Sequence, residues 1–139
     1  MFSCGPPLQV DGDFSGCAGI AEMLLQSTNG EVHLLPALPG AWSTGSFAGL
    51  RARGGFEVDA VWRDGRLVSA AVRSRLGAKC RLRSVEPLSV LLDGRPVPAG
   101  HPTELLPYGL KKGMVRPTTI TEFETKPGKE YVLSPSSRK

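Results

Sequence analysis

The feature that most constrains the fold is an alternating run of side chains in residues 56–76, FEVDAVWRDGRLVSAAVRSRL. Apolar residues occupy every second position from 56 to 62, and the pair Asp64-Gly65 interrupts the run near its middle. Alternation with a period of two is typical of a strand that buries one face, and Asp-Gly between two such runs is typical of a tight hairpin turn. The sequence therefore predicts an antiparallel hairpin made of strands 56–63 and 67–76.

Further strands are predicted on both sides of this hairpin. Residues 31–35 and 47–53 read as extended, and two more hairpins are expected, residues 90–97 around Asp93-Gly94 and residues 118–133 around Pro127-Gly128. Proline lacks the N–H group that a central strand needs, so Pro96 marks a sheet edge. Residues 98–117 are expected to form a loop or a loosely paired segment. The predicted fold is mainly β, an antiparallel β-sandwich of seven or eight strands preceded by a single α-helix.

The single helix is predicted over residues 14–28, where apolar residues recur at helical spacing. Asp13 is the expected N-cap, and Asn29-Gly30 is the expected left-handed stop. Cys17 falls on the apolar side of this helix and is expected to be a small core residue. A sandwich closes its core with its own two sheets, so this helix needs a packing partner of its own.

Charge and cysteine content exclude several kinds of site. The chain has 17 basic and 13 acidic residues, but its central arginines alternate with apolar residues, as expected for the solvated face of a sheet. Neither a nucleic-acid module nor a membrane-spanning stretch is present, and no signal peptide is expected in this chain. Its 3 cysteines have no Cys-x-x-Cys spacing, so no disulfide framework, zinc site or cofactor is predicted.

The residues that could carry chemistry are few. His33 lies in an extended apolar run and is expected to be packed or hydrogen-bonded, and His101 has no second metal ligand nearby in sequence. Asp11 and Asp13 stand among glycines ahead of the predicted helix and have an ordinary interpretation as turn and cap residues. A carboxylate at the positive end of a helix dipole also stays ionised, as a general base must. Asp11 is left as the one catalytic candidate.

Four segments resemble one enzyme family. They are PPLQVDGDFSGCAGIAEMLLQS, GEVHLLPALPGAW, GLRARGGFEVDAVWRDGRL and TEFETKPGKEYVLSP. In order and spacing they resemble the C-terminal portion of glycoside hydrolase family 95, the inverting α-L-fucosidases and their relatives. The sequence departs from the family pattern at Asp13, where an asparagine is common, and at Gly5, where a histidine often precedes the two prolines.

The resemblance implies a larger enzyme with three parts that include an N-terminal β-sandwich and an (α/α)6 barrel that holds the active site, both missing from this chain, and a C-terminal β-sandwich that packs against the barrel. Residues 1–30 would end the barrel, 31–133 would form the sandwich, and 134–139 would be a disordered tail. Asp11 matches the family's general base. The parent would cleave terminal α-L-fucosyl or α-L-galactosyl linkages of a glycan, outside the cytoplasm, while this chain alone would be inactive. The alternative is a non-catalytic carbohydrate-binding or interaction module.

Overall fold

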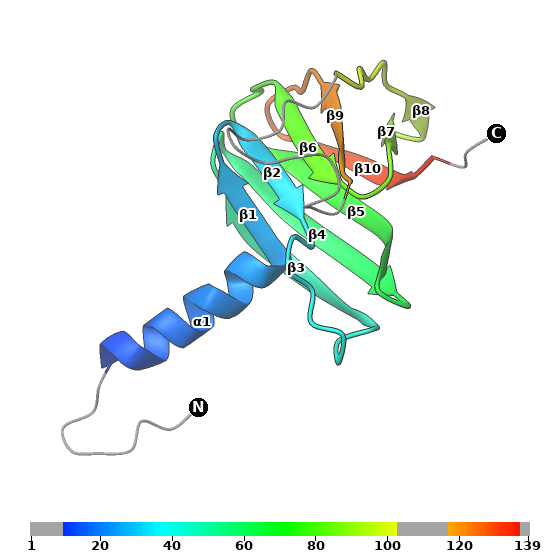
Figure 1. Ribbon diagram of the computed structural model, residues 1–139. Coiled ribbons are helices and arrows are strands. Elements are labelled where there is room, and N and C mark those ends of the chain that lie inside the picture. The colour runs from blue at the N-terminus through cyan, green and yellow to red at the C-terminus, as the bar shows by residue number, and fades with distance from the viewer. Residues whose placement is uncertain (1–9, 103–116, 137–139) are drawn as a thin grey trace.

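A computed structural model describes residues 10–102 and 117–136, with side chains from residue 14 onwards, and shows one helix followed by strands in two facing sheets (Figure 1). The helix is α1 (Val10–Leu24). One sheet has four strands in the order β1-β2-β6-β9 and the other has six in the order β3-β4-β5-β10-β7-β8. The strands are β1 (Leu25–Thr28), β2 (Glu31–Leu34), β3 (Gly45–Ala52), β4 (Phe56–Arg63), β5 (Arg66–Ser74), β6 (Cys80–Ser84), β7 (Leu88–Leu92), β8 (Arg95–Pro96), β9 (Thr119–Phe123) and β10 (Lys129–Pro135). The predicted mainly-β sandwich with one helix in front of it is confirmed.

The two hairpins predicted from Asp-Gly pairs are present. β4 pairs with β5, and β7 pairs with β8. The turn residues Asp64 and Gly65 have φ values of 51° and 69°, and Asp93 and Gly94 have 50° and 76°. Two successive positive φ values match the twist of the flanking strands, which is why Asp-Gly is so informative. β8, which contains Pro96, is the edge strand that the proline predicted.

The third predicted hairpin is wrong. β9 pairs with β6 in the four-stranded sheet, whereas β10 lies between β5 and β7 in the six-stranded sheet. The connection therefore crosses the sandwich, and the Phe123 and Tyr131 rings meet across the core with centroids 5.3 Å apart. Buried Thr125 fixes the crossing, because its hydroxyl lies 2.7 Å from Ser74 Oγ and donates to the Ala78 carbonyl.

Three smaller expectations about the strands also change. The described residues contain ten strands rather than seven or eight, and β2 runs parallel to β6. The predicted disordered tail begins too early, because Ser134 and Pro135 pair with β7. For residues 98–117, predicted as a loop or a loosely paired segment, the isolated bridge between Gly100 and Glu122 agrees with loose pairing, and residues 103–116 lie outside the described part.

The helix prediction is wrong at both ends. α1 begins at Val10, so Asp13 lies inside the helix and is not its N-cap. Its C-terminal end is Leu24, because Leu25 enters the core as the first residue of β1 and pairs with Leu34. Asn29-Gly30, with φ values of 52° and 74°, forms the β1–β2 hairpin turn and not a helix stop.

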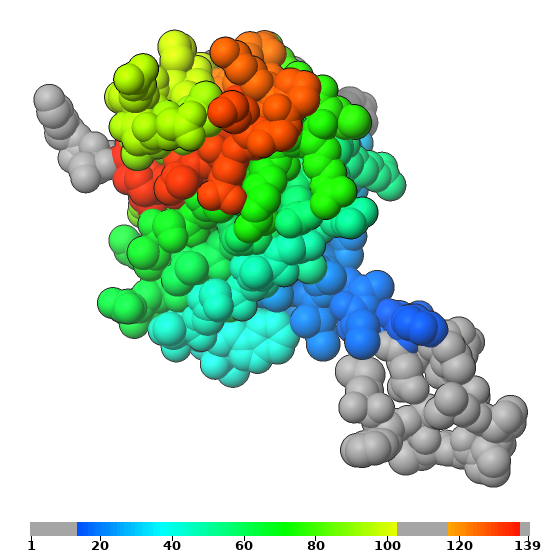
Figure 2. Space-filling model, turned by 180° about the vertical axis from the view of Figure 1, so that it is seen from behind, coloured from blue at the N-terminus to red at the C-terminus, as the bar shows by residue number. Residues whose placement is uncertain are grey.

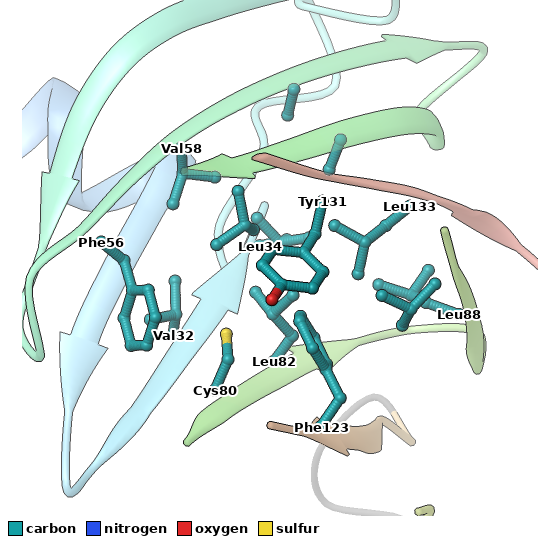
Figure 3. Close-up of a cluster of buried hydrophobic side chains, with 14 of the residues drawn as sticks. Val32, Leu34, Phe56, Val58, Cys80, Leu82, Leu88, Phe123, Tyr131 and Leu133 are labelled. Carbon is teal, nitrogen blue, oxygen red and sulfur yellow. The ribbon is translucent and has the colours of Figure 1, made fainter. Parts of the chain in front are cut away.

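The core lies between the two sheets and is filled by alternate residues of both (Figure 3). Leu82 on β6 and Leu133 on β10 are fully buried, and Cys80 packs among the same side chains. Phe56 and Trp62 are buried as the alternation predicts, and Trp62 Nε1 donates to the Trp42 carbonyl at 2.8 Å. The core is complete without α1, which projects from one end of the sandwich (Figures 1 and 2).

The arginines of the middle strands lie on the outer faces of the sheets, as the alternation predicted. On the six-stranded sheet, Arg73 pairs with Glu57 at 3.1 Å, with Glu130 at 2.9 Å and with Asp59. On the four-stranded sheet, Glu31 pairs with Arg81 and Arg83 at 3.1 and 2.7 Å. Carboxylates of the same sheet therefore pair with these arginines.

Candidate functional site

The catalytic candidate Asp11 is the second residue of α1, and Asp13 is the fourth. The first turn of a helix favours a carboxylate because its N–H groups have no partner within the helix and the dipole is positive there. The placement therefore suits an ionised carboxylate at either position. The side chains of both residues lie outside the described part, so the catalytic role of Asp11 stays a prediction.

α1 is attached to the sandwich through its C-terminal end. The Leu24 carbonyl accepts a hydrogen bond from Leu35 N–H at 2.9 Å, and the Met23 carbonyl accepts one from Ala37 N–H at 3.2 Å. In the N-terminal half of the helix, away from the sandwich, Phe14 is 70% exposed and Cys17 is exposed. The expected core position of Cys17 is thus wrong for this chain, because the sandwich does not cover that part of α1.

A cavity of about 400 Å³ opens beside the segment after β2, the same segment whose Leu35 and Ala37 N–H groups bind the last carbonyls of α1. Its lining comes from three connections, the start of the β2–β3 loop, the β4–β5 turn and the β6–β7 link, and from the strand ends next to them. We call this region the helical end. Gly65 N–H donates to the Ser43 carbonyl at 2.8 Å, which ties two of the loops of the helical end together. The residues that line the cavity are mostly aliphatic and include Leu34, Leu35, Leu38, Leu67, Val85 and Leu88, with Asp64, Arg66 and Glu86 among the polar ones.

Sequence patterns did not reveal this cavity, because its lining comes from loops and strand ends that are far apart along the chain. One residue of the lining, Leu35, has an unusual backbone conformation. This residue has a φ of 52°, a left-handed conformation that costs a non-glycine residue about 1–2 kcal/mol. Its N–H bond to the Leu24 carbonyl stabilises this conformation, and its side chain lines the cavity.

The two histidines occupy different environments. His33 lies on the outer side of β2, where its register partners are Gln26 and Arg83. Burial and the nearby Arg83 guanidinium lower the pKa of His33 to about 4, and the Glu31 carboxylate opposes this shift. His101 is exposed, and its Nδ1 lies 3.3 Å from the Ile120 carbonyl oxygen. The expectation that His33 is packed rather than ligating agrees with its surroundings.

The lowered pKa of His33 predicts acid-sensitive stability. Between pH 6.5 and 4 the unfolded chain binds a proton at His33 and the folded chain does not, so the free energy of unfolding falls as the pH falls. After discounting for partial exposure, we expect His33 to account for a loss of about 1–3 kcal/mol. Urea unfolding at pH 7 and pH 4 should show a smaller loss for His33→Gln than for the wild type. His101→Gln is the control, and equal losses in all three proteins would contradict the prediction.

The described side chains hold no cluster of three or more His, Cys, Asp or Glu that could bind a metal ion. Cys80 is buried in the core, and burial raises the pKa of its thiol to about 12, so it is not a nucleophile. No helix in the described part is long and apolar enough to cross a membrane.

The aromatic residues bear on the alternative of a glycan-binding module. Phe56, Trp62, Phe123 and Tyr131 are buried in the core. Among the described aromatic side chains, the exposed ones are Phe14 on α1 and Trp42, which is 37% exposed in the β2–β3 loop. Sugar binding on a sheet face usually uses an exposed aromatic platform, and the described residues present none on either outer face, so the geometry does not favour this alternative.

Comparison with known proteins gives consistent results. The family model described as glycoside hydrolase family 95, C-terminal domain, matches residues 26–133. Alpha-L-fucosidase 2 of Arabidopsis thaliana is 42% identical over 98 residues, which cover 68% of this chain and 12% of the plant protein. Probable alpha-fucosidase A of Aspergillus niger is 35% identical over 81 residues, covering 50% of this chain and 10% of the fungal protein. The similar protein of Aspergillus oryzae is 38% identical over 88 residues, covering 56% and 12%.

The matched region coincides with the sandwich, since it begins in β1 and ends in β10. The chain spans about an eighth of the length of the Arabidopsis relative. Because the family model covers most of the chain, the assignment of this chain to the family no longer depends on the resemblance of a few segments. The chain belongs to glycoside hydrolase family 95, whose C-terminal domain its β-sandwich forms.

Proposed function

We propose that this chain is the C-terminal part of an inverting glycoside hydrolase that cleaves terminal α-L-fucosyl or α-L-galactosyl linkages of a glycan. The observation that carries the proposal is the family match over residues 26–133, together with relatives named as α-fucosidases. Since the chain spans about an eighth of the plant relative, the remaining active-site residues belong to the part of the parent that precedes it.

In this proposal α1 is the last helix of the catalytic barrel. The exposed apolar side chains of α1 support this, because a barrel would supply the neighbours that the sandwich does not. β1 is paired with β2 in the sandwich, so we place the boundary between the two domains after Leu24 rather than at residue 30.

Asp11 is the proposed general base. An inverting enzyme needs a carboxylate base and a carboxylic acid about 6.5–9.5 Å apart, so that a water molecule fits between the base and the sugar. Asp11 supplies the first group from the N-terminal turn of α1, where the dipole favours an ionised carboxylate by about 0.3–1 kcal/mol. The acid and the walls of the sugar site come from the preceding part of the parent.

A hybrid enzyme tests the proposal. Residues 6–136 of this chain would replace the corresponding C-terminal segment of the Arabidopsis relative, and release of the aryl group from an aryl α-L-fucoside would be measured. The hybrid should hydrolyse the substrate and the isolated 139-residue chain should not, because one carboxylate without its acid partner does not stabilise the transition state. An inactive but folded hybrid, or an active isolated chain, would contradict the proposal.

A further inference from the structure

The turn between β1 and β2 contains the only asparagine of the chain, Asn29, and Gly30 follows it directly. Both residues are exposed, and no atom of the described part, apart from chain neighbours, lies within 4 Å of the place where Gly30 would carry a Cβ. Glycine has no side chain to hinder attack of its main-chain nitrogen on the preceding side chain, so an asparagine before glycine loses ammonia more readily than other asparagines. The turn is therefore a candidate site of chemical modification.

The reaction requires a free side-chain amide on Asn29 and a free nitrogen on Gly30. In the described part of the chain, the Asn29 side chain and the Gly30 N–H group form no hydrogen bond. The equivalent N–H group of the β4–β5 turn, on Gly65, donates to the Ser43 carbonyl at 2.8 Å. An amide that donates a hydrogen bond is harder to deprotonate and to move. The Gly30 nitrogen is thus free to react, whereas the Gly65 nitrogen is held.

Three turns of the sandwich share one backbone conformation. The φ values are 52° and 74° at Asn29-Gly30, 51° and 69° at Asp64-Gly65, and 50° and 76° at Asp93-Gly94. Aspartate therefore fits the first position of this turn as well as asparagine does. Isoaspartate does not fit, because it adds a methylene group to the main chain, and the match between turn and strand twist depends on two ordinary residues with positive φ.

The hairpin that this turn closes also holds α1. The turn lies at the end of the hairpin away from α1 (Figure 1), and β1 pairs with β2 from Thr28 and Glu31 at the turn to Leu25 and Leu34 at the other end. Leu25 is buried in the core, and the N–H group of Leu35, just past β2, binds the last carbonyl of α1 at 2.9 Å. A longer main chain in the turn therefore disturbs both the pairing of the strands and the attachment of the helix.

We propose that Asn29 is a site of spontaneous deamidation in the folded protein, and that the isoaspartyl product loosens the hairpin that holds α1. The Gly30 nitrogen gives up its proton and bonds to Cγ of Asn29; the bond from Cγ to the side-chain nitrogen breaks, and that nitrogen leaves as ammonia. Water then opens the cyclic imide. Cleavage of the new N–Cγ bond gives aspartate, and cleavage of the bond to the main-chain carbonyl carbon gives isoaspartate. The inference goes beyond the proposed function and does not depend on it, because the reaction belongs to this chain alone.

Peptide mapping of the aged 139-residue chain tests the reaction, with the two Asp-Gly turns as internal controls. Isoaspartate should form about tenfold faster at Asn29 than at Asp93-Gly94, because ammonia leaves an amide more readily than water leaves a carboxyl group. Formation should be slowest at Asp64-Gly65, where the glycine nitrogen is hydrogen-bonded. The rate at Asn29 should rise from pH 6 to pH 8 and stay within about tenfold of the rate in urea. Stronger protection by folding, or equal rates at the three turns, would overturn the inference.

The effect on the hairpin is tested on the separated products. Hydrophobic-interaction chromatography resolves the isoaspartyl form, which should melt about 3–6 °C below the fresh chain. Hydrogen exchange at the Leu35 N–H group should be about tenfold faster in that form. Asn29→Asp is the matched control, since it carries the same charge on an ordinary main chain and should melt and exchange as the wild type does. An isoaspartyl form that behaves as the fresh chain does, or an equal loss in Asn29→Asp, would refute the proposed loosening.

Discussion

Replacing Leu82 by alanine is expected to remove a large part of the stability of this protein. Leu82 is fully buried on β6 between the two sheets, and its neighbours include core residues of both. Loss of a buried leucine side chain costs about 2–5 kcal/mol, since transfer from water is lost and a cavity remains. A domain of this size is stable by only about 5–15 kcal/mol. Urea unfolding should show a midpoint lower by about 1 M or more with an unchanged slope.

Leu76→Ala is the matched control for this experiment. Leu76 is 70% exposed just after β5, so the same truncation removes little buried surface and should change the free energy of unfolding by less than about 0.5 kcal/mol. If both substitutions lowered the midpoint equally, the assignment of Leu82 to the core between the sheets would be wrong.

Replacing Asp11 by asparagine in the hybrid enzyme is expected to lower kcat by about 10²–10⁴-fold, the usual contribution of a general base. Asparagine keeps the size of the side chain but does not accept the proton of the attacking water. KM should change much less than kcat, because the lost interaction belongs to the transition state. Steady-state kinetics on an aryl α-L-fucoside measures both constants.

Asp13→Asn is the control for the Asp11 experiment. Asp11 and Asp13 both lie in α1, and positions two apart on a helix face different sides of it. We therefore expect Asp13→Asn to keep kcat within about tenfold, with the acid limb of the pH profile unchanged. A loss at Asp13 equal to the loss at Asp11 would refute the assignment of the base.

Local patterns predicted the elements whose turns and partners are adjacent in sequence. The hairpins around Asp64-Gly65 and Asp93-Gly94 formed because their turn residues adopt the positive φ values that the strand twist requires. The outward arginines and the buried Phe56 and Trp62 followed from the same alternation. In these segments the two-residue alternation determines which side chains are buried and which face outward.

Contacts distant in sequence decided the remainder. The segments around Pro127-Gly128 carry an ordinary hairpin signal, but each finds a better partner elsewhere, β9 beside β6 and β10 between β5 and β7. The cavity at the helical end also depends on distant contacts, since its lining comes from loops and strand ends that are far apart in sequence. The residues of a turn do not determine which strands pair, because pairing also depends on which distant strands still lack a partner.

The helix and the turn at Asn29-Gly30 show most clearly what the sequence determined and what the tertiary structure determined. By itself, the sequence determined that a helix precedes a β-sandwich and that Asn29-Gly30 adopts a left-handed turn. Such a pair can end a helix or close a hairpin, and its local energy is favourable in both. Only the tertiary structure decided for the hairpin, because Leu25 gains burial in the core and pairs with Leu34 when the helix ends at Leu24.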